Sequence, residues 1–337
     1  MKRIPLLQIS HLEKRFTVNE KWMSQWRLNK GRSYKKQNTV YALNGISLTL
    51  HKGETLCIVG ETGCGKSTLA RSIIGLLKPD AGEIYYGDQR IDNLNDRQRL
   101  IFRRRMQMVF QNPYSSLNPR MTIYQTLSEP IRFHNPHLSS TEVDEKVSQL
   151  IESVGISNSW VDRYPHEFSG GQRQRISLAR ALSVDPHLII ADEPLAALDV
   201  SVQAQVLNLM MDKQAEHELT YLFITHDLSV VEHFSNRVAV MYLGTICELS
   251  PTKTLFEAPK HPYTQALLSA IPRLDNNTQK PIRLIGEVPT PYKTIVGCPF
   301  QARCPFSQER CLQETPKMQK QSDGSIVACH AVEESRL

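Results

Sequence analysis

The sequence lacks any run of about 18 apolar residues, which is the length that a membrane-spanning helix requires. It also lacks an excess of one charge, because 40 lysine and arginine residues face 34 aspartate and glutamate residues and leave a formal net charge of +6. Such a small surplus suits an anionic membrane surface or a nucleotide as readily as nucleic acid. With 40% hydrophobic and 22% charged residues, the 337-residue chain has a globular composition, which excludes a disordered, collagen-like or low-complexity protein. The length fits about two domains.

An obvious secretion signal is also missing. Glu13, Lys14 and Arg15 interrupt the N-terminal sequence before the apolar core of a signal peptide could form, so we expect the protein to stay in the cytosol. Disulfides are rare in that reducing compartment. Four of the seven cysteines nevertheless fall in the last forty residues, a clustering that indicates metal or cluster binding more often than disulfides. These are Cys298, Cys304, Cys311 and Cys329.

The N-terminal part of the chain predicts an antiparallel sheet. Residues 4–16 and 40–59 alternate between apolar and polar positions as half-buried strands do. The insert at residues 18–38 has neither a strand pattern nor a clean helical period. It contains two tryptophans one helical turn apart among basic residues, so we interpret it as a solvated loop, with a membrane-surface patch as the alternative. The side chains concerned are Trp22, Trp26, Lys30, Arg32, Lys35 and Lys36.

From Thr55 onward the pattern becomes α/β. The short apolar strand LCIVG is followed by a glycine-rich turn and by a helix from about Lys66 to Leu77. Residues 112–168 are rich in turns and helical periodicity, which predicts a helical insertion, and strands return at 188–191 and 221–225. Beyond about residue 259, prolines and polar residues indicate a separate C-terminal extension. The sequence has no internal repeat.

The glycine-rich turn has the pattern of a phosphate loop. Residues 60–68, GETGCGKST, match G-x-x-x-x-G-K-[ST] and lie between a predicted strand and a predicted helix, as this motif requires. Glycines let backbone N–H groups surround the β-phosphate, Lys66 brings charge to the β- and γ-phosphates, and Ser67 offers a hydroxyl to Mg²⁺. The candidate nucleotide-binding residues are Gly60, Glu61, Thr62, Gly63, Cys64, Gly65, Lys66, Ser67 and Thr68.

Two further patterns complete a phosphate-handling site. An apolar strand ends in Asp192 and Glu193, where one carboxylate can hold Mg²⁺ and the other can orient and deprotonate the attacking water. The turn Ser169-Gly170-Gly171-Gln172 opens a helix over residues 173–181, and its N–H groups form an anion site. One nucleotide cannot easily use both helix ends of one monomer. The second end is therefore expected to cap ATP bound to a partner.

These motifs together resemble the ATP-binding-cassette (ABC) ATPases over about residues 4–260. The order of the phosphate loop, FSGGQ, LIIADE, ALD and ITHDL is that of the family. The resemblance implies a phosphate-loop NTPase cassette with a RecA-like core, an antiparallel β subdomain and a helical subdomain at about 112–180, plus a small cysteine-containing extension at 261–337. Residues 1–260 are the expected ATPase domain.

The resemblance also implies roles for residues outside these patterns. Gln111 senses Mg²⁺ or the lytic water, His226 contacts the γ-phosphate, and Asp199 couples two sites across a dimer. An aromatic residue stacks on adenine; Phe16 has the expected position, with Tyr41 as the alternative. The expected catalytic set is thus Glu193, His226 and Gln111, and the expected Mg²⁺ ligands are Ser67, Gln111 and Asp192.

SSLNPRMT at 115–122, HPYTQALLSAIP at 261–272 and GEVPTP at 286–291 resemble the dipeptide and oligopeptide importer branch of this family. That likeness implies ATP and Mg²⁺ as cofactors, a second homologous ATPase subunit, two transmembrane permease subunits and a periplasmic peptide-binding protein. It places the protein on the cytoplasmic face of the inner membrane, with no nucleic-acid partner. Oligopeptide, nickel and haem remain alternatives to a dipeptide as cargo, because the ATPase does not touch the cargo.

The four C-terminal cysteines resemble tail cysteines of these importers that ligate a [4Fe-4S] cluster. Four thiolates suit iron–sulfur and also tetrahedral zinc, their spacing is not a ferredoxin pattern, and free cysteines are the remaining alternative. His330 beside Cys329 is a further candidate ligand. Two other classes of function are the alternatives. A soluble cassette acting on nucleic acid or assembly generally has paired cassettes or a coiled coil, and an iron–sulfur protein with a vestigial ATP site would not need the complete motif set.

Overall fold

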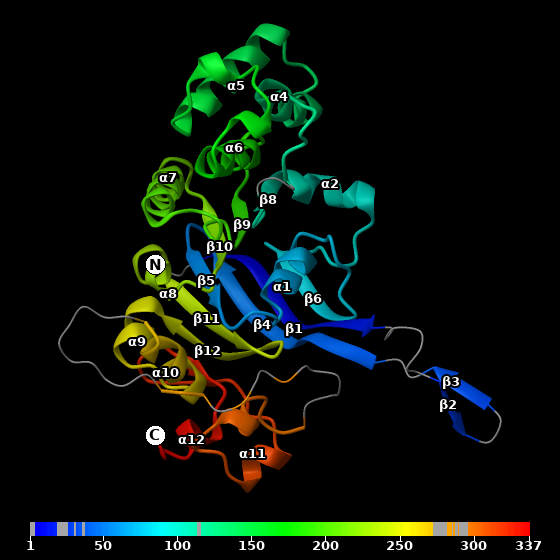
Figure 1. Cartoon of the computed structure of the whole chain (residues 1–337), viewed down its shortest axis with the longest axis vertical. Helices are drawn as coiled ribbons and strands as arrows, with labels where there is room; N and C mark the ends of the chain where they lie inside the picture. Colours follow the sequence, from blue (N-terminus) through cyan, green and yellow to red (C-terminus); the bar gives the residue numbers. More distant parts are fainter. Residues whose placement is uncertain are drawn as a thin grey trace. The chain divides into compact units, whose positions relative to one another are not determined.

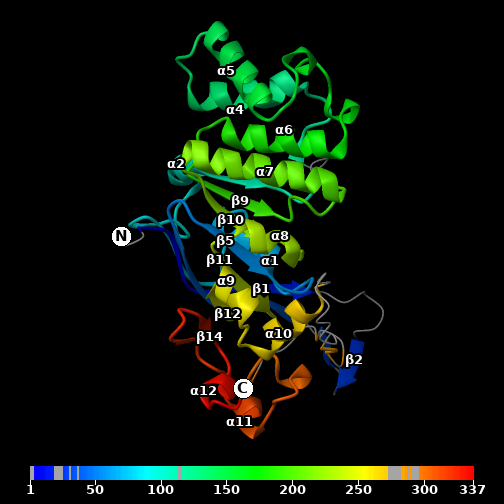
Figure 2. The same ribbon diagram turned by 90° about the vertical axis from the view of Figure 1, so that its left-hand side faces the viewer.

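The computed structural model describes residues 4–18, 26–29, 32–35, 38–112, 116–271, 282–284, 286, 289 and 296–337. The chain divides into two compact units, each assembled from segments that lie far apart in the sequence (Figures 1 and 2). Unit 1 comprises Met1–Leu7, Leu50–Ile58 and Gln89–Asn236; unit 2 comprises Gln8–Thr49, Val59–Asp88 and Arg237–Leu337. A search of the described helices for one long and apolar enough to cross a membrane found none.

Unit 1 is built on parallel strands in the order β5, β10, β9, β8. Every residue of β5, β9 and β10 is buried, as parallel strands covered on both faces require. The register pairs Ile224 with both Ile58 and Asp192, so these strands end at one edge of the sheet. The strands are β5 (Thr55–Val59), β8 (Met106–Val109), β9 (Leu188–Asp192) and β10 (Thr220–Ile224).

Capping boxes begin four helices of unit 1, α2, α4, α5 and α6. In each, the N-cap side chain and the residue three positions later satisfy each other's backbone N–H groups, which sets the start of the helix. The helical elements of unit 1 are α2 (Asp96–Arg105), α4 (Ile123–His134), α5 (Ser140–Ser153), η1 (Asn158–Trp160), η2 (Pro165–Glu167), α6 (Gly170–Leu182), α7 (Val200–His217) and α8 (Leu228–Phe234); the short strand β7 spans Gln89–Arg90.

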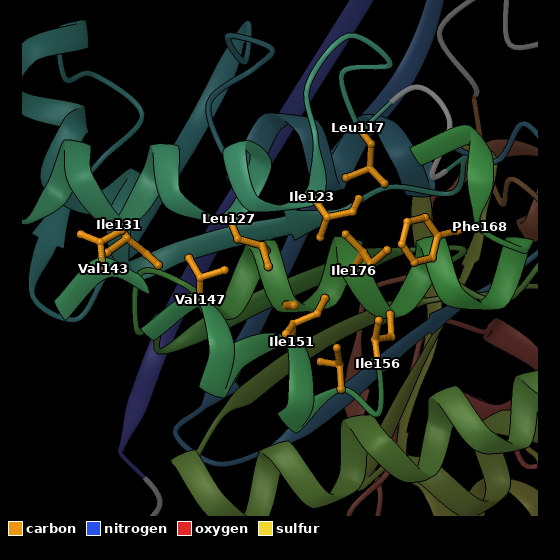
Figure 3. Packing of buried hydrophobic residues seen from close by; sticks show 12 residues of the cluster. Leu117, Ile123, Leu127, Ile131, Val143, Val147, Ile151, Ile156, Phe168 and Ile176 are labelled. Atoms are coloured by element: carbon orange, nitrogen blue, oxygen red, sulfur yellow. The ribbon is translucent and has the colours of Figure 1, made fainter. Parts of the chain in front are cut away.

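Helices α4, α5 and α6 share a hydrophobic core, which confirms the predicted helical insertion. Apolar residues recur every four positions on α4 and α5, so each helix presents one buried stripe. Figure 3 shows these side chains pointing toward one another. The buried residues of this helical core are Leu117, Ile123, Leu127, Ile131, Val143, Val147, Ile151, Val154, Ile156, Phe168, Ile176 and Ala179.

Unit 2 contains two groups of strands. The first has the order β4, β1, β6, and the second has the order β11, β12, β14, β13 with antiparallel pairing. The bounds are β1 (Pro5–Val18), β4 (Asn38–His51), β6 (Ala81–Tyr86), β11 (Arg237–Tyr242), β12 (Thr245–Pro251), β13 (Gln319–Lys320), β14 (Ile326–Val327), α1 (Lys66–Ile73), α9 (Thr252–Glu257), α10 (Pro262–Ser269), η3 (Gln301–Arg303), α11 (Glu309–Gln313) and α12 (His330–Glu333). The C-terminal residues thus belong to the same unit as the phosphate loop.

Two local predictions differ from the structure. The insert at 18–38 was expected to have no strand, but β2 (Trp26–Asn29) and β3 (Arg32–Lys35) pair as an antiparallel hairpin. Two residues that include a glycine join these short strands, which is a hairpin signal. The interpretation of the insert as a solvated loop or membrane patch rests partly on Trp22, Lys30 and Lys36, which lie outside the described residues.

Helix α1 is shorter than expected and ends at Ile73 instead of Leu77. Gly75 adopts a φ of 80°, and the N–H groups of Leu76 and Leu77 both donate to the Arg71 carbonyl. A glycine in the left-handed region after the last turn is a common helix stop. Leu76 and Leu77 fit the apolar pattern of the helix, so the sequence predicted a helix end that lies too far along the chain.

The helical core makes a prediction about stability. Ile151 is fully buried in it, so Ile151→Ala should lower the free energy of unfolding by about 2–5 kcal/mol through lost burial and a residual cavity. Urea unfolding followed by circular dichroism measures this. Phe133→Ala is the control, since Phe133 lies on α4 but is 66% exposed. Equal losses for both variants would contradict the assignment of the core.

Candidate nucleotide site

The phosphate loop follows β5 and is held closely by the backbone of unit 2. Gly60 has a φ of 151° and Gly65 a φ of 107°, both in the region that favours glycine. A Cβ at Gly60 would lie 2.2 Å from the Met241 carbonyl oxygen, and one at Gly65 would lie 2.3 Å from that of Ala42. These glycines are therefore required by the fold of the loop as well as by any ligand.

The loop surrounds the side chain of Lys66, the first residue of α1. Its ammonium group is buried and donates to the carbonyls of Gly60, over 2.8 Å, and Glu61, over 3.1 Å. The N-cap of α1 is Gly65, which has no side chain to occupy the N–H groups of the first helical turn. Backbone donors and a cation thus meet at the start of one helix, an arrangement that suits a phosphate group.

The Cys64 thiol accepts from the Lys66 ammonium over 3.9 Å, whereas the Glu61 side chain is engaged elsewhere. The Glu61 carboxylate pairs with Arg303, and the Glu61 N–H donates to the Tyr263 hydroxyl over 2.9 Å. The Cys64 thiol is buried, which raises its pKa. Our sequence analysis missed Arg303 and Tyr263 as neighbours of the loop. Tyr263 belongs to the HPYT segment that we had singled out, but nothing local in the sequence links either residue to Glu61.

The two candidate adenine-stacking residues lie in the same unit as the phosphate loop. Phe16 is on β1 and Tyr41 is on β4, and both are half-buried. The Lys14 ammonium lies 5.6 Å from the centre of the Phe16 ring, and the Arg15 guanidinium lies 5.2 Å from that of Tyr41. Both rings are thus accessible and flanked by cations. Stacking of Phe16 on adenine stays a prediction.

In unit 1, the adjacent acids Asp192 and Glu193 lie at the carboxyl end of β9. Asp192 is buried as the last residue of the strand. Glu193 has a φ of 48°, a left-handed conformation that non-glycine residues adopt infrequently, and its N–H donates to the Ile224 carbonyl over 2.9 Å. Backbone strain of this kind often marks a functional residue.

The Glu193 carboxylate contacts the two other expected catalytic side chains, Gln111 and His226. The Gln111 amide nitrogen donates to it over 3.0 Å, and His226 Nδ1 lies 3.3 Å from the same oxygen. Gln111 follows β8 by two positions and His226 follows β10 by two, so the ends of neighbouring parallel strands bring the three together. The His226 side chain is 56% exposed, against 15% for Glu193.

The Ser-Gly-Gly-Gln turn begins α6, as predicted. Ser169 is the N-cap: its hydroxyl accepts from the Gln172 N–H, while the Gln172 side chain accepts from the Ser169 N–H over 2.9 Å. The N–H groups of Gly170 and Gly171 in the first turn have no intrahelical acceptor. A Cβ at Gly171 would lie 2.3 Å from a Val202 methyl carbon, whereas one at Gly170 would make only an ordinary contact at 3.5 Å.

Asp199 lies at the start of α7, and its side chain does not cap the helix. It is the N-cap residue, but its carboxylate makes no capping hydrogen bond, and the residue is exposed. The next residue, Val200, is 81% exposed. A carboxylate and an apolar side chain are therefore both exposed at the start of α7.

Family models match the chain in two places. Residues 43–196 match the family described as ABC transporter, and residues 247–311 match the C-terminal region of oligopeptide/dipeptide transporters. The phosphate loop and the Asp192–Glu193 pair lie within the first match. Fold and motifs together define a cassette ATPase.

Similar proteins define the branch. The oligopeptide transport ATP-binding protein AppF of Bacillus subtilis (strain 168) is 50% identical over 90% of this chain and 93% of its own length. The dipeptide transport ATP-binding protein DppF of Escherichia coli (strain K12) is 47% identical over 98% and 95%. A solved dimeric post-hydrolysis structure of the ATP-binding cassette MJ0796, bound to ADP and Pi, has 25% identity and a TM-score of 0.61, covering 73% of this chain and 98% of that one. The chain belongs to the ABC transporter ATP-binding proteins of the dipeptide/oligopeptide family.

The prediction of an iron–sulfur cluster is corrected by these results. Within the described residues, no three cysteine, histidine or acidic side chains form a group that could hold a metal ion. The four C-terminal thiols are free, and burial raises the pKa of Cys298 to about 12. Burial also raises the pKa of Cys304 and Cys329. Among the described residues, Cys298, Cys304, Cys311 and Cys329 form no metal-binding group of the kind that the prediction requires. The family model that matches residues 247–311 and the relative DppF are both described in terms of peptide transport.

The two glycines of the α6 turn allow a paired test. Gly171→Ala should lower the free energy of unfolding by about 1–3 kcal/mol, because its methyl group overlaps Val202. Gly170→Ala should leave stability within about 0.5 kcal/mol, since the chain itself leaves room for a Cβ there. Thermal and urea unfolding of both variants measure the difference. A large loss for Gly170→Ala would show that a contact within the chain requires this glycine.

Proposed function

We propose that this chain is the ATP-binding and ATP-hydrolysing subunit that energises import of dipeptides or oligopeptides across the inner membrane. The observation that carries the proposal is the arrangement of Gln111 and His226 on the Glu193 carboxylate. Retention of this trio, together with a complete phosphate loop, supports a hydrolytically competent site. The peptide cargo is supported by the relatives, which are described as transporting dipeptides or oligopeptides.

The phosphate loop binds the nucleotide in this proposal. The N–H groups of the α1 N-terminus and the Lys66 ammonium meet the β- and γ-phosphates, and the Phe16 ring stacks on adenine. Lys66 already faces acceptor oxygens of the loop, so phosphate oxygens replace carbonyls as its partners. The exchange is favourable because a phosphate carries a full negative charge and a carbonyl does not.

Glu193 acts as the general base in hydrolysis. Its carboxylate accepts a proton from the attacking water, while Gln111 and His226 fix its orientation and contact the water or the γ-phosphate. Ser67, Gln111 and Asp192 offer hydroxyl, amide and carboxylate oxygens, the hard donors that suit Mg²⁺. When bound, this ion neutralises charge on the phosphate oxygens.

A second, homologous ATPase subunit completes the site. The Gly170 and Gly171 N–H groups cap a nucleotide bound by the partner subunit, and Asp199 and Val200 contact that subunit. Room for a Cβ at Gly170 within this chain supports the idea that its glycine serves an external group. The nucleotide contacts both subunits only when the dimer is closed. Its binding therefore shifts the population toward the closed dimer.

Other chains complete the transporter. Two transmembrane permease subunits convert closure and opening into access on alternate sides, and a periplasmic protein delivers the peptide. The ATPase subunit is peripheral, on the cytoplasmic face of the inner membrane. The family match over residues 247–311 supports this assignment, since it is specific to oligopeptide/dipeptide transporters.

Glu193→Gln tests the base. We expect ATP hydrolysis to fall by at least about a hundredfold, because the amide cannot accept the proton, while ATP binding persists. Phosphate release and binding of a fluorescent ATP analogue, measured on the reconstituted transporter, separate the two effects. Glu232→Gln, at an exposed position on α8, is the matched control. Normal turnover in Glu193→Gln would refute the assignment.

Lys66→Ala tests the phosphate loop. Removal of the ammonium group should weaken ATP binding by at least about tenfold and cripple peptide uptake, since a charge-assisted contact to phosphate is lost. Lys253→Ala removes an 85% exposed lysine side chain and serves as the control. Unchanged uptake by the Lys66 variant would mean that this chain does not energise transport.

A further inference from the structure

The phosphate loop is tied to the C-terminal part of unit 2 through one residue, Glu61. Arg303, 242 positions later, donates from both guanidinium ends to the two Glu61 carboxylate oxygens, over 2.8 and 3.1 Å. The Arg303 side chain is 7% exposed and that of Glu61 is 25% exposed. A bidentate pair shielded from water in this way is both directional and costly to break from one side.

The same residue is also held through its backbone. The Glu61 N–H donates to the Tyr263 hydroxyl over 2.9 Å, and Tyr263 is fully buried on α10. Arg303 additionally donates to the Tyr242 hydroxyl over 3.5 Å. Two side chains contributed by segments beyond β12 thus restrain both the peptide N–H and the carboxylate of one loop residue.

A buried aromatic group makes these restraints rigid. The Tyr263 ring lies 4.7 Å from that of Tyr242 and 5.4 Å from that of Phe300, and Phe300 lies 5.3 Å from Tyr242. All three rings are at most 1% exposed. Close contacts among buried rings leave the Tyr263 hydroxyl little freedom to follow a displaced loop.

Glu61 also contacts Lys66, the lysine of the phosphate loop, through its backbone carbonyl. Its carbonyl accepts from the Lys66 ammonium over 3.1 Å and from the Cys64 N–H over 3.3 Å. The residue therefore connects the C-terminal aromatic group on one side with the lysine and the loop turn on the other. A shift of Glu61 would displace the carbonyl that helps to orient Lys66.

We propose that Arg303 and Tyr263 are positioning residues of the ATP site, which hold Glu61 so that the phosphate loop is preorganised for nucleotide. Neither touches the nucleotide in this proposal; they act through Glu61. The C-terminal region is thereby part of the machinery that sets ATP affinity. The inference rests on the proposed nucleotide site and assigns it two further residues, contributed by the importer-specific part of the chain.

The test compares two arginines of the C-terminal region. Arg303→Gln removes the pair with Glu61, whereas Arg310→Gln removes a half-exposed arginine on α11 that pairs with Glu314 and Glu334. In the assembled transporter, we expect Arg303→Gln to raise the KM for ATP about tenfold, equivalent to about 1.4 kcal/mol, with kcat changed less than about threefold. Arg310→Gln should leave both constants unchanged. Melting temperatures of both variants report any general loss of stability.

A double-mutant cycle separates positioning from folding. Glu61→Gln alone should raise the KM for ATP as Arg303→Gln does, and the double variant should be no worse than either single one. Tyr263→Phe, which keeps the ring and removes only the hydroxyl, should raise the KM without lowering kcat. If Arg303→Gln fails to fold, Glu61→Gln and Tyr263→Phe carry the test.

The outcomes discriminate this inference from the proposed function. A wild-type transporter that does not bind ATP would contradict the proposed function. A wild-type transporter that binds ATP, with a KM unchanged in Arg303→Gln, Glu61→Gln and Tyr263→Phe, would overturn the positioning role alone. A fall in kcat at constant KM, or additive effects of Glu61→Gln and Arg303→Gln, would also overturn it.

Discussion

The phosphate loop depends on the close approach of its backbone to the backbones of two neighbouring segments. Gly60 and Gly65 leave no space for a Cβ because the carbonyl oxygens of Met241 and Ala42 occupy it. The pairing of β11 with β12 shifts register between Val240 and Met241, at the position that contacts Gly60. The N–H of Gly244, in the turn between β11 and β12, further donates to the Cys64 carbonyl over 2.9 Å. The shape of the loop is therefore imposed by the strands of unit 2, and a ligand meets donors that are already in place, which reduces the ordering cost of binding.

The parallel sheet of unit 1 brings together the three side chains of the proposed catalytic set, Glu193, Gln111 and His226, from distant parts of the chain. Parallel strands end at the same edge, so residues that follow β8, β9 and β10 become neighbours without any contact in sequence. Glu193 needs one further feature: its left-handed backbone redirects the carboxylate toward Gln111 and His226. A residue in this conformation costs of order 1 kcal/mol, which the surrounding hydrogen bonds offset.

Motifs confined to a few consecutive residues were predicted well, and contacts between distant segments were not. The phosphate loop, the acidic strand end and the α6 turn each depend on local chemistry, so their residues and elements could be read from the sequence. The end of α1 at Ile73, shortly before Gly75, and the β2–β3 hairpin were missed, although both had local glycine signals. Arg303 could not have been assigned to Glu61, because 242 positions separate them and nothing in either segment specifies the pairing. The cysteine spacing was misleading for a related reason: proximity in sequence did not produce a metal-binding group.

The N-termini of α1 and α6, the two proposed phosphate-binding helix ends, differ in their N-caps. The N-cap of α1 is Gly65, which offers no side chain to the N–H groups of the first helical turn. The N-cap of α6 is Ser169, which forms a closed capping box with Gln172. Contact between α6 and a phosphate must therefore use the Gly170 and Gly171 N–H groups or open the box, at a cost of about 1 kcal/mol. In the proposed dimer, such a contact at α6 is weaker than the one at α1, so nucleotide stays on one subunit while the dimer closes and opens.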